Sequence, residues 1–120
     1  MIENFRRFTA GPDPFGRSYD VRFLWAQNGI SIRHADTVDV KWELKSDTDA
    51  TQKVVALPHP DLLNIAARHS RPITDPWCMK LAALHLEQMI LTGEDMEKTI
   101  VTVSNPEMER YAAALEKQHA

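Results

Sequence analysis

The chain has 120 residues, of which 43% are hydrophobic and 26% charged, and its formal net charge is −3. This is ordinary usage for one globular domain, and it excludes disordered, collagen-like and low-complexity chains. There is no basic stripe that could neutralise nucleic-acid phosphates or anionic lipid, so the sequence predicts neither nucleic acid nor membrane as a partner.

Features that would direct the chain out of the cytoplasm are missing from the sequence. The stretch from Met1 to Phe8 lacks the apolar region of a signal peptide, and no apolar run approaches the roughly 20 residues of a membrane span. Cys78 is the only cysteine, so no intrachain disulfide can form, which suits a reducing compartment. We expect a cytoplasmic protein that folds as a single domain over residues 1–120.

The first organised segment is a long hairpin over residues 17–45. Residues 1–16 are predicted to be irregular, because glycines and prolines punctuate their second half. From residue 19 the chain alternates at strand period, interrupted only at Leu24, with large apolar side chains at odd positions: Tyr19, Val21, Phe23 and Trp25. A second strand carries its apolar side chains at even positions: Ile30, Ile32, Val38, Val40, Trp42 and Leu44.

Asn28-Gly29 predicts the turn of this hairpin, because both residues tolerate the positive φ that a type I′ turn requires. A two-residue turn at this point fixes the register of the strands. It places Trp25 opposite Ile32, Phe23 opposite His34 and Tyr19 opposite Val38, all on one face that also holds Trp42. A bulge or bend is expected at residues 34–36, where the apolar pattern stops.

The remainder predicts two further strands and three helices. Residues 46–52 read as a polar loop, 53–57 as a third, antiparallel strand, and 98–103 as a fourth strand. Pro60, Pro76 and Pro106 mark the first turns of three helices, with Asp75 and Asn105 as the expected N-caps of the second and third. The sheet therefore occupies residues 17–57, and residues 58–120 are mainly helical.

The two later helices differ in their apolar surfaces. The helix from Asp75 to Thr92, ended by Gly93, is apolar around most of its circumference, which predicts a central core helix. Its narrow solvent strip is expected at Lys80, Ala83 and Glu87. The last helix has a thin apolar stripe and should lie at the surface; the stripe consists of Met108, Tyr111, Ala112 and Leu115. The predicted fold is α+β: an antiparallel sheet of three to four strands built on the long hairpin, with about three helices packed mainly on one face.

Three histidines lie on faces assigned to the core, namely His34, His69 and His85. Histidine can act as an acid or base near neutral pH, but a buried histidine is more often a space-filling residue with one hydrogen bond. If a ligand site exists, we expect it between the sheet and the helices, with His34 or His85 as polar anchor and Trp25 and Trp42 as its aromatic floor.

Recognisable catalytic or cofactor motifs are absent from the sequence. His69, Cys78 and His85 match no zinc spacing, and Cys78 reads as a small buried hydrophobe rather than a nucleophile. Asp47-Thr48-Asp49 opens like a calcium loop but continues without its glycine and its glutamate. No glycine-rich phosphate loop is present. The sequence therefore predicts no catalytic residue, no metal site and no cofactor.

Two functional hypotheses remain open, and the pattern leans away from an enzyme. The first is a noncatalytic binding or protein-interaction domain, with a homo-oligomer formed through a sheet edge or through the last helix. The second is a small enzyme or small-molecule-binding protein with the histidine-containing pocket described above.

Overall fold

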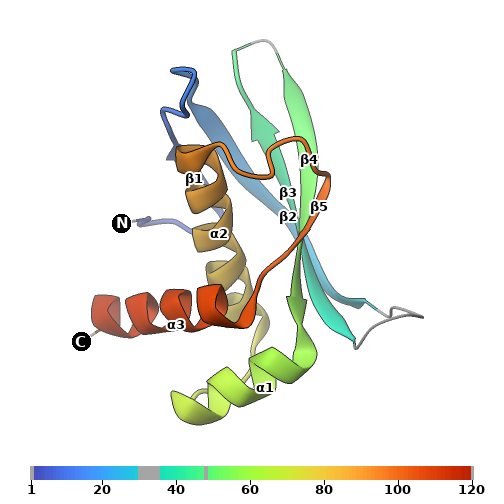
Figure 1. Cartoon of the computed structure of the whole chain (residues 1–120), viewed down its shortest axis with the longest axis vertical. Coiled ribbons are helices and arrows are strands. Elements are labelled where there is room, and N and C mark those ends of the chain that lie inside the picture. Colours follow the sequence, from blue (N-terminus) through green and yellow to red (C-terminus); the bar gives the residue numbers. More distant parts are fainter. Residues whose placement is uncertain (1, 30–35, 48, 120) are drawn as a thin grey trace.

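The computed structural model describes residues 2–29, 36–47 and 49–119. It shows an α+β fold in which one mostly antiparallel sheet is covered by three helices (Figure 1). The strand order is β1-β2-β3-β4-β5, with β5 parallel to β4 and all other neighbours antiparallel. In chain order the elements are β1 (Arg7–Ala10), β2 (Tyr19–Gly29), β3 (Thr37–Lys45), β4 (Ala50–Pro58), α1 (His59–Arg68), α2 (Asp75–Thr92), β5 (Ile100–Thr102) and α3 (Asn105–His119).

The predicted fold class is confirmed, with one strand more than expected. The third and fourth predicted strands are β4 and β5, and β4 is longer than its apolar run because it continues into residues read as a polar loop. The additional strand, β1, lies within residues 1–16, where we expected irregular structure. Its alternation is only four residues long, with Phe8 and Ala10 buried, and the surrounding glycines and prolines mask it.

The predicted hairpin turn is wrong. Asn28 and Gly29 belong to β2 and pair with Val38 and Thr37 of β3, so the connection lies beyond them. The predicted contacts of Ile32 and His34 fall outside the described residues, but Trp25 is opposite Lys41 and Phe23 is opposite Trp42. Tyr19, expected opposite Val38, instead pairs with Ala10 of β1.

Burial explains why β2 and β3 pair in the observed register and not in the predicted one. The two-residue turn would have placed Trp42 and Leu44 beside the entry loop at Phe15 and Asp13, whereas the observed register places them beside Phe23 and Val21. Fully burying a large apolar side chain contributes about 1.5–3 kcal/mol, which exceeds a local turn preference. Trp42, Leu44 and Val21 are all buried as a result.

A β-bulge at Leu24 accounts for the break in alternation within β2. The β2–β3 register shifts between Phe23 and Trp25, so Leu24 is the extra residue. Side chains beyond the bulge therefore change face. Trp25 lies next to Lys41 on the open face of the sheet, while Trp42 points to the helices, and the expectation that the two tryptophans share a face is wrong.

The N-caps of α2 and α3 lie one residue before the predicted caps, Asp75 and Asn105, which are instead the first helical residues. The hydroxyl of Thr74, rather than Asp75, accepts from the Trp77 N–H at 3.2 Å at the start of α2. At α3, Ser104 and Glu107 form a reciprocal capping box: the Ser104 hydroxyl accepts from the Glu107 N–H, and the Glu107 carboxylate accepts from the Ser104 N–H. Gly93 ends α2 in the left-handed conformation with φ 76°, as predicted.

The core lies between the sheet and α2, and α3 packs on α1 and α2. Ala83 is buried, so it does not belong to the solvent strip that we predicted, and the Lys80 ammonium lies over the Phe5 ring. The apolar stripe of α3 is confirmed, since Met108, Tyr111, Ala112 and Leu115 are buried. No helix in the described part of the chain is long and apolar enough to cross a membrane.

Candidate functional site

The predicted ligand-site residues that the structure describes lie in separate environments. Trp42 is fully buried in the core, where its ring meets Phe8 and Phe23 edge to face, at centroid distances of 6.0 and 5.6 Å. Trp25 lies on the opposite side of the sheet. His85 lies on α2 and faces α3, and His34 is outside the described residues. A ligand-binding role for any of them stays a prediction.

His85 belongs to a buried polar network between α2 and α3. It is 4% exposed, and its Nδ1 lies 2.9 Å from the Tyr111 hydroxyl oxygen. Tyr111 in turn donates to Gln88 Oε1 at 3.0 Å, so the Nδ1–H of a neutral His85 ring donates to the Tyr111 oxygen. Burial lowers the pKa of His85, although the nearby Glu107 carboxylate opposes this, and burial raises the pKa of Tyr111 to about 12. The network holds two helices together with both groups uncharged.

His69 connects α1 to α3 through two carboxylates. Its Nε2 lies 2.8 Å from Glu109 Oε1 and its Nδ1 lies 3.0 Å from Glu116 Oε2. Both carboxylates only accept hydrogen bonds, so making both bonds at once requires the protonated ring. Hydrogen bonds with Glu116 and Glu109 raise the pKa of His69. Both carboxylate partners of His69 therefore belong to the last helix, α3.

This His69 contact predicts a pH-dependent stability. A raised folded-state pKa means that the contribution is complete below the unfolded value, about 6.5, and is lost as pH rises through the folded pKa. His69→Gln should therefore cost on the order of 1 kcal/mol of unfolding free energy at about pH 6, because the carboxylates are partly solvated, and clearly less at about pH 9. Urea unfolding of the variant and the wild-type chain at both pH values measures this difference.

Glu116→Gln serves as a graded comparison for the same contact, since it removes one of the two carboxylates. It should show the same pH trend with a smaller loss. A His69→Gln penalty that is equal at both pH values would contradict an ionic role for His69.

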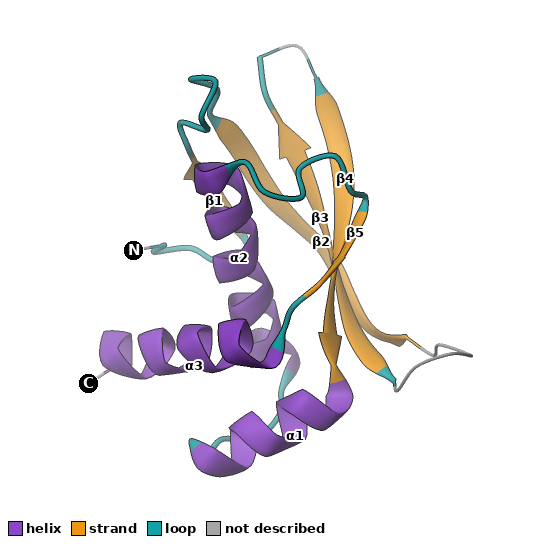
Figure 2. Cartoon of the chain, in the orientation of Figure 1, coloured by secondary structure: helices purple, strands orange, loops and turns teal. Residues whose placement is uncertain are grey.

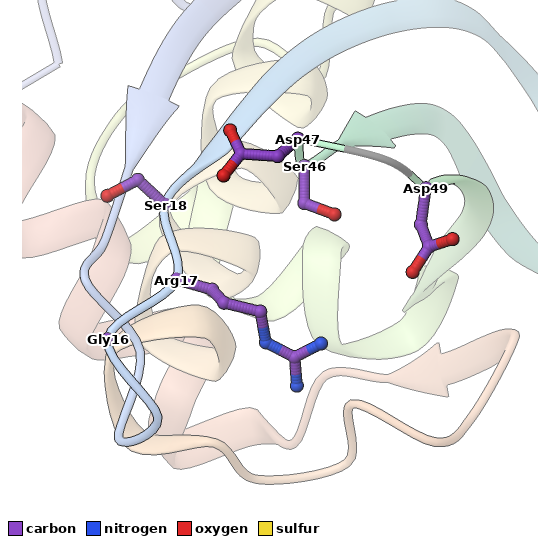
Figure 3. A pocket seen from close by; sticks show the side chains of 6 residues that line it. All are labelled: Gly16, Arg17, Ser18, Ser46, Asp47 and Asp49. Carbon is purple, nitrogen blue, oxygen red and sulfur yellow. The ribbon is translucent and has the colours of Figure 1, made fainter.

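A cavity of about 510 Å³ opens at the end of the sheet and is lined by Gly16, Arg17, Ser18, Ser46, Asp47 and Asp49 (Figure 3). The Arg17 side chain reaches into it, with Asp49 on the facing side. The Asp13 carboxylate accepts hydrogen bonds from the backbone N–H groups of Arg17 and Phe15, and the Arg17 bond in particular lowers the pKa of Asp13. Arg17 Nε also lies 3.6 Å from the Asp13 carboxylate, so the positive charge of Arg17 already has a negative partner.

Two further chemistries can be assessed from the described residues. Cys78 is buried, and burial raises the pKa of its thiol to about 12, so it is not a thiolate at neutral pH. Within the described ranges, no three histidine, cysteine, aspartate or glutamate side chains are grouped so that they could hold a metal ion.

The open face of the sheet carries a row of side chains across four strands. Trp25 pairs with Lys41, Lys41 with Val54, and Val54 with Ile100, so these four residues, the Trp25 row, project from one face. The three helices lie on the other side of the sheet (Figure 2). Ile100 is 64% exposed, and the other three side chains are partly exposed. The Lys41 ammonium lies 5.6 Å from the centre of the Trp25 ring, so its charge lies beside an aromatic surface.

On one side of the Trp25 row, the charges of the same face are paired with one another. Arg22 and Glu43 are joined at 3.3 Å and Lys45 approaches Glu43 at 3.8 Å. On the other side, the Asp39 carboxylate accepts from the Thr37 hydroxyl at 2.7 Å. The face therefore combines a partly exposed aromatic and aliphatic row with a charged and polar border, which is the arrangement of many protein interfaces.

Comparison with protein-family models, curated proteins and solved structures gives no match. The function is therefore argued from the chain's own surfaces.

Sequence reasoning missed the Trp25 row because three registers and one bulge determine it. The exposed position of Ile100, in particular, depends on the parallel pairing of β5 with β4. One signal was present: Leu24 broke the alternation of β2, and a bulge was the physical alternative that would have moved Trp25 to the other face.

Proposed function

We propose that this chain is a noncatalytic protein-interaction domain that binds a protein partner on the Trp25 row of its open sheet face. The observation that carries the proposal is the row itself: a partly exposed tryptophan at one end and a largely exposed isoleucine at the other, on a face that none of the described helices covers. Tryptophan is enriched among the residues that dominate interface energies. Strand residues also present such a row rigidly, which limits the entropy lost on binding.

The contacts on the inner side of the sheet favour this proposal over a histidine-containing pocket. Trp42 packs against Phe8 and Phe23 in the core, and His85 hydrogen-bonds to Tyr111. These side chains serve packing and the joining of helices. The open face, in contrast, holds apolar side chains whose exposure the fold itself does not require.

A photo-crosslinking amino acid at position 100 tests the proposal in cells that express the protein. The matched control carries the same amino acid at Leu63 on α1, which is 54% exposed and lies away from the open face. We expect an adduct of discrete mass from position 100 and none from position 63. Val54→Lys, placed next to residue 100 in the row, should abolish the adduct because it puts a charge into the contact.

The proposal fails if positions 100 and 63 give the same adducts, or if Val54→Lys leaves the adduct of position 100 unchanged. Circular dichroism of the Val54→Lys protein verifies that the fold is intact, since Val54 is only partly buried.

A further inference from the structure

The outer edge of β2 is only half covered. β1 pairs with Tyr19–Arg22, and the Phe23 N–H donates to Arg6 O, but β1 ends there. β2 continues past it to Gly29 (Figure 1). Along residues 24–29, no described strand pairs with this edge.

Hydrogen bonds at the other end of the sheet determine which backbone groups point to this edge. Val54 donates its N–H to Thr99, and Ala56 accepts from Val103, so both residues direct their backbone groups toward β5. In an antiparallel ladder successive residues bond alternately to the two neighbours. The partners of Val54 and Ala56 on β3, Lys41 and Asp39, therefore direct their backbone groups to β2.

The same alternation continues into β2. Trp25 and Gln27 are opposite Lys41 and Asp39 and so bond toward β3. Ala26 and Asn28 consequently direct both their N–H and their C=O groups outward, away from the sheet. The open edge thus offers two donors and two acceptors in the spacing of a β-ladder.

This edge lacks the features that usually prevent strand pairing. The segment Leu24–Gly29 contains no charged residue and no proline, and only the bulge at its start disturbs it. The opposite edge strand, β5, is only three residues long, and a very short edge strand offers little for another strand to pair with. The Lys53 ammonium, which donates to the carbonyls of Met96 and Lys98, also holds the loop before β5 against β4. An uncharged open edge is a template for a further strand.

We propose that the Leu24–Gly29 edge pairs with the same edge of a second copy of the chain, antiparallel about a twofold axis at Gln27. Ala26 then exchanges both backbone hydrogen bonds with Asn28 of the partner subunit, and the two sheets become continuous. A second copy fits because an antiparallel copy of this edge presents the complementary donors and acceptors, and no like charges meet. The inference rests on the proposed function and deepens it, since it brings two Trp25 rows onto one continuous face.

Three variants and sedimentation velocity over the micromolar range test the pairing. Ala26→Pro removes one outward N–H but no donor of the β2–β3 ladder, so it should convert a wild-type dimer to a monomer with unchanged circular dichroism. Gln27 is exposed and lies on the twofold axis, so Gln27→Lys should raise the dissociation constant about tenfold through like charges that face each other. Mixing Gln27→Lys with Gln27→Glu should restore dimers, because opposite charges then meet. If the Ala26→Pro protein misfolds, the mixing of Gln27→Lys with Gln27→Glu decides whether the edge pairs.

Val54→Lys changes the open face but not the Leu24–Gly29 edge, so it should leave the dimer intact. A dimer that Val54→Lys dissociates and Gln27→Lys does not would overturn the edge pairing while leaving the proposed use of the open face standing. A strictly monomeric wild-type chain also overturns the pairing of two copies. This holds even if the edge then pairs with a segment of another protein. The position-100 adduct would survive either outcome if the proposed function is right.

Discussion

Trp42→Ala is expected to destabilise the fold by about 3–5 kcal/mol, the usual cost of removing a buried aromatic side chain. Trp42 is 0% exposed, and it joins β1 and β2 through its contacts with Phe8 and Phe23. Alanine leaves a cavity that cannot collapse easily, because three strands and the core helix surround it. Urea unfolding followed by far-UV circular dichroism measures the loss, which is a large part of the stability of a domain of this size.

Trp25→Ala is the matched control, since it removes the same side chain from the other face. Trp25 is partly exposed and its aromatic neighbour is the Lys41 ammonium, so we expect a loss of about 1 kcal/mol. Equal losses for the two alanine variants would contradict the bulge at Leu24. Trp42→Phe should cost under about 1.5 kcal/mol, because it keeps most of the ring and removes an indole N–H that has no hydrogen-bond partner among the described residues.

The strands that pack on the helices were predictable from sequence because burial enforces a period of two. Val38, Val40, Trp42 and Leu44 are buried in strict alternation along β3. The extent of α2 was predictable for a different reason, since Pro76 marks its first turn and Gly93 its end. The hairpin turn was not predictable from sequence. The turn preference of Asn28-Gly29 is a local property, whereas the burial of Trp42, which decides the register, depends on contacts across the whole sheet. A single extra residue, Leu24, was enough to reverse the face of the strand beyond it.

Contacts between elements far apart in the chain limited the prediction of the candidate site. Glu109 and Glu116 lie seven residues apart, hence on one face of the predicted last helix, which is a visible signal for a cationic neighbour. That this neighbour is His69 depends on how α1 packs against α3. The exposure of Ile100 similarly depends on the parallel pairing of β5, which no local pattern indicates.

Lys53→Met should cost about 2–3 kcal/mol of unfolding free energy. Lys53 is 5% exposed, and its ammonium donates to Met96 O at 2.7 Å and to Lys98 O at 2.6 Å. Burial lowers the pKa of Lys53, so the charged form carries a desolvation cost that methionine would avoid. Two charge-assisted hydrogen bonds contribute about 1.5–3 kcal/mol each, and their loss exceeds that saving. Urea unfolding measures the total.

The structural effect of Lys53→Met should also be local, because the two hydrogen bonds of Lys53 hold the loop before β5 against β4. We expect the substitution to accelerate amide hydrogen exchange in Lys98–Thr102 more than in α2, because neither hydrogen bond of Lys53 runs to that helix. Lys45→Met is the matched control: Lys45 is exposed and only 3.8 Å from Glu43, so the substitution should change stability by no more than about 0.5 kcal/mol. If Lys53→Met is neutral, the desolvation cost balances the hydrogen bonds, and the loop must be held by the pairing of β5 with β4. In that case Ile100–Thr102 would exchange no faster than in the wild-type chain, which separates the two explanations.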